Sequence, residues 1–129
     1  AYLTSFVEFI SDRDALPQAA EMILHLEGVY TVLVFGINDD KVQLSARSRD
    51  PKVNLGRILQ NAFGELNSGG HATMAAGVIK LEKLGDPNDK ASLLKVTSDD
   101  IKNRFFSSVE AEFESDILPV GKESQVDLV

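Results

Sequence analysis

The sequence predicts a single α+β domain, in which a mixed sheet of four or five strands is flanked by helices. Three features indicate this fold. The chain has 129 residues, which is the usual size of one domain. Segments with the two-residue alternation of strands lie between segments with helical periodicity. Hydrophobic residues make up 43% of the chain and charged residues 26%, so it has enough apolar side chains to bury a core.

The first helix is expected between Asp12 and Gly28. Asp12 or Asp14 can cap its amino end, Pro17 lies early enough to be tolerated, and Gly28 can end the helix. Its apolar residues recur at helical spacing and are expected to face the core: Leu16, Ala19, Ala20 and Ile23.

A β-hairpin is predicted to follow. Residues 29–37 are rich in β-branched and aromatic side chains, residues 38–40 form a polar turn, and residues 41–48 alternate strictly. Because successive side chains of a strand point to opposite faces, Arg47 and Arg49 are expected to point the same way.

The middle of the chain is predicted to be a helix, a glycine turn and a short strand. Residues 54–66 have helical periodicity and end at the glycine-rich residues 67–70. Residues 71–76 are small and predict one or two helical turns close to another backbone, and residues 78–81 predict a strand.

The last third of the chain is predicted to end in a helix. Residues 85–90 predict a loop and residues 92–96 a short strand. Thr97 and Asp100 resemble a capping box, so the amphipathic helix is expected to begin at Thr97. Residues 119–129 are polar and without periodicity, and we expect a flexible tail. The aromatic residues of this helix are expected to pack in the core rather than to stack on nucleobases: Phe105, Phe106 and Phe113.

The composition excludes several kinds of chemistry. Cysteine is absent, which excludes disulfides and thiol nucleophiles and favours a cytoplasmic setting. The formal net charge of -7 opposes non-specific attraction to long polyanions. The chain has two histidines and neither an HExxH nor a GxSxG motif, so we assign no catalytic residue and no metal ligand to it. No apolar run approaches the ~20 residues of a membrane span, so no membrane partner is expected.

The glycine turn from Ser68 to His71 is the most informative segment. Two consecutive glycines, Gly69 and Gly70, permit positive φ and allow successive N–H groups to converge on an anion. The His71 imidazole would add a donor to a bound phosphate. The alternative is a structural turn between two helices, in which His71 caps a helix or is half-buried.

A second feature is a local reversal of charge. Residues 41–57 contain five basic residues and one acid, so this window has a net charge of about +4 in an acidic chain. An arginine offers phosphate two parallel N–H groups, and Arg47 could meet an anion at the glycine turn if the intervening helix folds back. The alternative is a solvated strand face. The five basic residues are Lys41, Arg47, Arg49, Lys52 and Arg57.

Together, these motifs resemble the C-terminal DHH-associated domain of the DHH phosphoesterases. That group includes RecJ-like exonucleases, oligoribonucleases and phosphodiesterases that act on cyclic dinucleotides. The resemblance covers about residues 29–78 and implies a DHH-associated domain over residues 1–118, in which residues 1–10 lead in from a catalytic domain. Its motifs are Leu44–Ser48 (LSARS), Val53–Asn54, Phe63–Gly64 and Ser68–Gly77 (SGGHATMAAG).

The resemblance implies a function for this chain. Relatives place catalytic manganese ions in a separate N-terminal domain with an Asp-His-His triplet, which does not occur here. This chain would therefore be the substrate-binding part of a manganese-dependent phosphoesterase or exonuclease, a hydrolase, and would be inactive alone. Its partners would be short single-stranded nucleic acid or a dinucleotide phosphate, and the DHH catalytic domain of the same polypeptide. The residues that the resemblance assigns to the phosphate and the terminal nucleotide are Arg47, Ser48, Ser68, Gly69, Gly70 and His71.

One departure and two other functions stay open. Relatives usually run from Phe-Gly almost directly into three glycines, whereas Glu65–Ser68 intervene here. Alanyl-tRNA synthetases carry a related C-terminal domain, which would make this chain a tRNA-binding appendage. Alternatively, the glycine turn is structural and the domain has no ligand, serving as a structural or dimerisation module in a homodimer.

Overall fold

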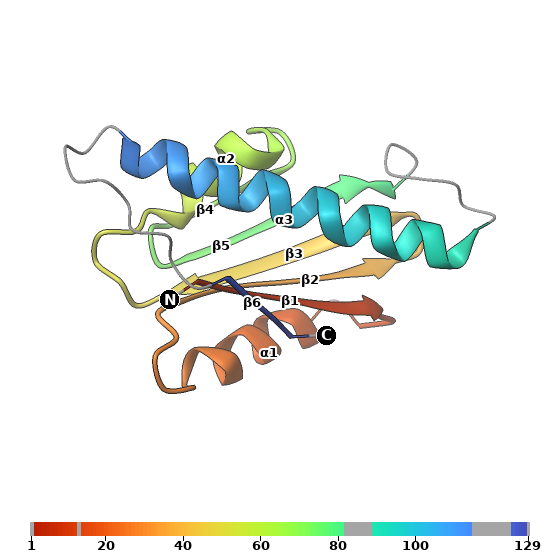
Figure 1. Cartoon of the computed structure of the whole chain (residues 1–129), viewed down its shortest axis with the longest axis horizontal. Helices are drawn as coiled ribbons and strands as arrows, with labels where there is room; N and C mark the ends of the chain where they lie inside the picture. Colours follow the sequence, from red (N-terminus) through yellow and green to blue (C-terminus); the bar gives the residue numbers. More distant parts are fainter. Residues whose placement is uncertain (1, 13, 82–88, 115–124, 129) are drawn as a thin grey trace.

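A mixed sheet with helices on both faces forms the part of the chain that the computed structural model describes, namely residues 2–12, 14–81, 89–114 and 125–128. The sheet has six strands in the order β4-β5-β3-β2-β1-β6. Helix α1 covers one face, and α2 and α3 cover the other (Figure 1). The predicted α+β class with a mixed sheet flanked by helices is therefore confirmed. The elements are β1 (Tyr2–Phe9), α1 (Ala15–Leu24), β2 (Thr31–Asn38), β3 (Lys41–Ser48), α2 (Leu55–Phe63), β4 (Ser68–Gly70), β5 (Met74–Lys80), α3 (Lys90–Glu114) and β6 (Gln125–Leu128).

The strand directions follow from the connections between the strands. The predicted hairpin is β2 and β3, which pair antiparallel from Thr31 opposite Ser48 to Asn38 opposite Lys41. Strand β5 pairs antiparallel with both β3 and β4. Strand β1 is parallel to β2 and to β6. The parallel pair of β1 and β2 needs a crossover connection, which α1 provides.

The hydrophobic core has two parts because the sheet is covered on both faces. The larger part lies between the sheet and the helices α2 and α3, and includes Phe35, Ile58 and Phe105. The smaller part lies under α1, where Leu16 and Ala20 pack against β1 and β2. Phe106 and Phe113 also pack against the larger part, so the prediction that the aromatic residues of α3 belong to the core is confirmed.

The first ten residues contribute more to the fold than the sequence predicts. Residues 2–9 form β1 between β2 and β6, whereas the sequence predicts a lead-in there. Residues Tyr2–Phe6 are all buried. A strand buried on both faces has no polar and apolar alternation, which is why its pattern is not recognised in the sequence.

Both edges of the sheet hold short strands, which raises the strand number above the four or five expected. Strand β4 has three residues and falls in the predicted glycine turn. Strand β6 has four residues and lies within residues 119–129, where the sequence predicts a tail. The other residues of that predicted tail lie outside the described ranges.

Residues 71–76 are not helical, contrary to the prediction from their small side chains. Residues 71–73 connect β4 to β5, and Met74 begins β5 opposite Arg47 of β3. Small residues fit here because the adjacent strands and α2 approach closely. Main-chain pairing with β3 and β4 therefore overrides the local helical preference.

Helix α3 begins at Lys90, seven residues before the predicted start, and it includes the predicted strand at residues 92–96. Asp89 precedes the helix, and its carboxylate accepts a hydrogen bond from the N–H of Ser92 (3.2 Å). Thr97 is therefore inside the helix, where it is fully buried. Most of the predicted loop at residues 85–90 lies outside the described residues. None of the described helices has the length and apolar character needed to cross a membrane.

Candidate functional site

The loop of residues 71–73 (the 71–73 loop) is held in place by its carbonyl groups. The carbonyls of the three residues accept, in order, hydrogen bonds from the N–H groups of Gly56 (3.0 Å), Leu55 (2.9 Å) and Ser48 (3.0 Å). These donors belong to the amino end of α2 and the carboxyl end of β3. All three side chains of the loop are exposed. The loop therefore has a defined main chain and presents its side chains to solvent.

The amino end of α2 binds this loop and leaves no N–H group for an external anion. Its first two N–H groups donate to the 71–73 loop. The next two donate to Asn54: Arg57 to the side chain (3.2 Å) and Ile58 to the carbonyl (3.0 Å). Asn54 is thus the N-cap of α2. A phosphate at this site would have to bind outside the helix terminus.

Glycine is required at two positions because two backbones approach closely. A Cβ on Gly56 would lie 2.7 Å from the carbonyl oxygen of Gly70, so α2 contacts the β4 main chain directly. Gly70 has a φ of +147°, and a Cβ there would lie 2.5 Å from the carbonyl oxygen of Met74. Gly69 is less restricted, since its Cβ would meet only the Gln60 amide at 3.5 Å. The glycines of the turn therefore have a structural role, which does not exclude ligand binding.

Some donors of the turn are available to a ligand, whereas the N–H of His71 is not, because it donates to the carbonyl of Met74 (2.7 Å). In an antiparallel strand, the N–H groups of alternate residues point toward the partner strand, so the N–H of Gly70 points away from β5. Neither this N–H nor that of Ala72 donates a hydrogen bond to another residue of the described ranges. The exposed His71 imidazole and Thr73 hydroxyl lie on the same loop.

Arg47 is paired with an acid of α1. Its guanidinium lies on the face of the sheet that α1 covers and forms an ion pair with Glu21 of α1. The Gly70 carbonyl faces Gly56 of α2, which covers the other face. The Arg47 guanidinium is therefore paired with Glu21, on the opposite face of the sheet from the Gly70 carbonyl. Arg47 also has a buried Nε that has no hydrogen-bond partner.

The two predicted serines make internal hydrogen bonds. The Ser48 side chain is buried, and its hydroxyl lies 2.8 Å from the Thr31 hydroxyl and 3.2 Å from the Tyr30 carbonyl. It also accepts a hydrogen bond from the N–H of Asp50 (3.1 Å). The Ser68 hydroxyl donates to the Gly64 carbonyl (2.9 Å). In this structure both hydroxyls stabilise turns next to the 71–73 loop.

The positive window of the sequence is partly neutralised by acids from distant helices. Arg57 pairs with Glu112 of α3 (3.3 Å), as Arg47 does with Glu21 of α1. Lys41 is at the opposite end of β3 from the 71–73 loop. Near the loop, Arg49 and Lys52 are the two members of the window for which the described residues provide no acidic partner. Local charge counting missed this because the two acids belong to other elements.

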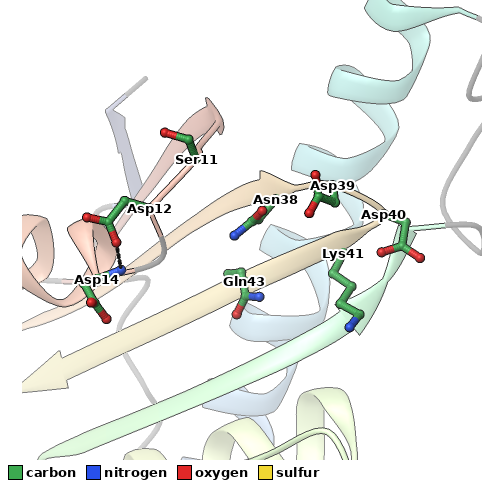
Figure 2. A pocket seen from close by; sticks show the side chains of 8 residues that line it. All are labelled: Ser11, Asp12, Asp14, Asn38, Asp39, Asp40, Lys41 and Gln43. Atoms are coloured by element: carbon green, nitrogen blue, oxygen red, sulfur yellow. Dashed lines mark hydrogen bonds between the residues drawn. The ribbon is translucent and has the colours of Figure 1, made fainter.

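A polar pocket lies at the other end of the sheet and is unsuited to phosphate (Figure 2). It is next to the turn between β2 and β3 and the segment after β1, and its one cation is accompanied by four aspartates. This local excess of negative charge repels anions. The described residues contain no group of three or more histidine or acidic side chains that could hold a metal ion. The pocket is lined by Ser11, Asp12, Asp14, Asn38, Asp39, Asp40, Lys41 and Gln43.

Comparison with known proteins shows to which family the chain belongs. Residues 1–103 match the DHHA1 domain. The chain belongs to the DHHA1 domain family. The predicted membership among the DHH-associated domains is therefore confirmed. This DHHA1 domain is 42% identical over 105 residues to an uncharacterised protein of Methanocaldococcus jannaschii, and the match covers 81% of the chain and 21% of that protein. The chain thus spans about a fifth of the length of this relative.

Two solved structures are similar to the DHHA1 domain. One is the C-Ala domain of Aquifex aeolicus alanyl-tRNA synthetase, with a TM-score of 0.51 and 18% sequence identity over 78% of this chain and 89% of that one. The other is an exopolyphosphatase-related protein from Bacteroides fragilis, with a TM-score of 0.42 and 16% identity over 70% of this chain and 24% of that one. The likeness to the C-Ala domain supports the fold.

Proposed function

We propose that this DHHA1 domain is the substrate-binding part of a DHH-type phosphoesterase. It binds a phosphate and the terminal nucleotide of a short single-stranded oligonucleotide or a dinucleotide, and presents them to a manganese-dependent catalytic domain of the same polypeptide. The observation that carries this proposal is the 71–73 loop, whose carbonyls are turned inward while the His71 side chain and the Ala72 N–H stay available. A loop fixed in this way offers donors to phosphate with little ordering cost.

The charge distribution favours a small substrate. The net charge of -7 opposes contact with many phosphates at once, and affinity for long nucleic acid depends on how many phosphates are neutralised. Near the loop, Arg49 and Lys52 supply a local positive charge for one or two phosphates. Holding a substrate in a fixed position contributes to catalysis even where the binding domain breaks no bond.

Arg47 would take part only after it leaves Glu21. The Glu21 side chain is 48% accessible, but the Arg47 side chain is only 23% accessible and its Nε is buried, so the value of about 0–1 kcal/mol for exposed pairs is a lower limit here. A substrate phosphate would have to displace the Glu21 carboxylate from Arg47. Glu21 would then act as an internal competitor for the phosphate.

Titration of the domain with three ligands tests the proposal. We expect a 5′-phosphorylated dinucleotide and a five-nucleotide RNA to bind, and His71→Ala to weaken both without changing the free energy of unfolding. Lys80→Ala is the control, because Lys80 is also exposed but lies at the other end of β5 from the 71–73 loop. Tighter binding of tRNA would favour the tRNA-binding function. Equal indifference to all three ligands would favour a structural module.

A further inference from the structure

Tyr30 and Arg49 form an ordered pair on the surface. The guanidinium carbon of Arg49 lies 4.7 Å from the centroid of the Tyr30 ring. The Nε of Arg49 donates to the Val29 carbonyl (3.1 Å), and its main-chain N–H donates to the Tyr30 carbonyl (2.9 Å). Two hydrogen bonds and a cation–π contact therefore hold this arginine in one place.

The pair is available to a ligand. Tyr30 is 49% exposed, although an aromatic side chain of its size is usually more buried. Arg49 is also exposed, and its terminal amino groups form no hydrogen bond or ion pair with the residues that the structure describes. Arg47 and Arg57 are instead paired with glutamates. Arg49 is thus an immobilised arginine without a carboxylate partner.

The pair lies next to the 71–73 loop. Thr31 of β2 is opposite Ser48 of β3, and the N–H of Ser48 donates to the Thr73 carbonyl. Tyr30, Arg49 and the loop therefore follow one another across three adjacent chain segments at the same end of the sheet. Adjacent strands are about 4.8 Å apart, so the main chain of Tyr30 is about 10 Å from the main chain of the loop. This is the span of one nucleotide from its phosphate to the far edge of its base.

We propose that Tyr30 and Arg49 form a stacking platform for the nucleobase of a nucleotide whose phosphate lies at the 71–73 loop. This inference rests on the proposed function and adds the site for the base. A tyrosine ring and a planar guanidinium both stack on bases of any sequence, so the platform selects nucleotides over other phosphates without selecting a base. The platform also explains why the Tyr30 ring is exposed, which its packing alone does not.

The test compares a ligand without a base with one that has bases. Ribose 5-phosphate has one sugar and one phosphate, whereas 5′-phosphorylated diadenylate adds two adenines, a second ribose and a second phosphate, so the Tyr30 variants are needed to isolate the effect of the bases. NMR titration of the 129-residue chain measures both affinities. We expect the dinucleotide to bind at least about 10-fold more tightly, since stacking of one base is commonly worth that factor or more.

The variants separate stacking from charge. Tyr30→Ala should remove most of the preference for the dinucleotide and leave ribose 5-phosphate within about twofold, whereas Tyr30→Phe should keep the preference, because a ring remains to stack. Arg49→Lys keeps the charge and loses the planar group, so it should also reduce the preference. Lys52→Ala is the control for a nearby exposed cation and should lower both affinities alike.

A second readout uses tyrosine fluorescence. The chain has no tryptophan and two tyrosines, of which Tyr2 is buried. Stacking of adenine should therefore quench mainly Tyr30, and the quenching should be absent in Tyr30→Phe.

The outcomes distinguish the two proposals. If wild-type protein binds both ligands but Tyr30→Ala leaves their affinity ratio unchanged, the stacking platform is refuted and the proposed function stands. If wild-type protein binds neither ligand, both proposals are refuted.

Discussion

Replacing Gly56 by alanine tests whether the close contact between α2 and β4 positions the candidate site. The new Cβ would lie 2.7 Å from the carbonyl oxygen of Gly70 and 3.1 Å from its carbonyl carbon. Both are main-chain atoms that cannot rotate away. Since carbon contacts are optimal at about 3.5–4 Å, the turn after β4 or the helix must shift by most of an ångström.

The expected effect on stability follows from two opposing terms. Alanine is favoured over glycine inside a helix by about 1 kcal/mol, which is an upper limit so near the amino end. Overpacking costs about 1–3 kcal/mol. The shift also weakens the hydrogen bonds that Leu55 and Gly56 donate to the 71–73 loop, at about 1 kcal/mol each. We expect a net loss of about 1–3 kcal/mol in the free energy of unfolding.

Urea denaturation measures the stability, and dinucleotide titration of the folded protein measures the effect on the loop. Gly56→Ala should lose both stability and affinity, although Gly56 itself is buried. For the stability measurement, Gly69→Ala is the matched control, because its Cβ meets only the Gln60 side chain at 3.5 Å. There the smaller entropy of the unfolded chain predicts a change between none and about 1 kcal/mol of added stability. A Gly56→Ala protein as stable as wild type, with unchanged affinity, would show that the close contact between α2 and β4 does not position the candidate site.

Three further variants test individual contacts. Ser48→Ala should lower the free energy of unfolding by about 1–3 kcal/mol in urea denaturation, because the buried Thr31 hydroxyl loses its partner; a loss near zero would contradict the internal role of Ser48. Glu21→Gln should raise the affinity for a dinucleotide several-fold while unfolding changes by less than about 1 kcal/mol, and an unchanged affinity would show that Arg47 does not contact the phosphate. Thr97→Val should raise the thermal midpoint, because the buried Thr97 hydroxyl has no hydrogen-bond partner and its removal should add about 1 kcal/mol; a lowered midpoint would argue for an internal water there.

The elements that the sequence predicts correctly have a strong local signal. The helix α1, the hairpin of β2 and β3, and the helix α2 each combine a clear periodicity with turn or capping residues, such as Asn54 before α2. Periodicity depends on neighbours within a few positions, so it can be recognised in the sequence without knowledge of the tertiary structure.

The elements that the sequence missed depend on distant partners. Strand β1 is buried on both faces between β2 and β6, so it has no alternation. Strand β5 contains Met74–Gly77, whose small residues resemble a helical turn until β3 and β4 pair with them. The early start of α3 follows from the Asp89 cap and from Leu93, which is buried. In each of these cases, contacts with distant parts of the chain outweigh the local conformational preference of the residues.

The candidate site, like the fold, could be predicted from the sequence only in part. Ser68–His71 and the Arg47 strand are recognisable as a motif because glycine and arginine have restricted uses in a turn and on a strand. The motif does not show that Arg47 is paired with Glu21, or that the 71–73 loop turns its carbonyls toward α2.

Periodicity and motif are properties of neighbouring residues, so the fold class, the family and the segment in which ligand chemistry is expected could all be predicted from the residues alone. Which of the positive side chains near the loop keep their charge unpaired could be seen only after the chain had folded. Ion pairing depends on side chains that approach within a few ångströms, and the acids that pair with Arg47 and Arg57 come from α1 and α3, far away along the chain.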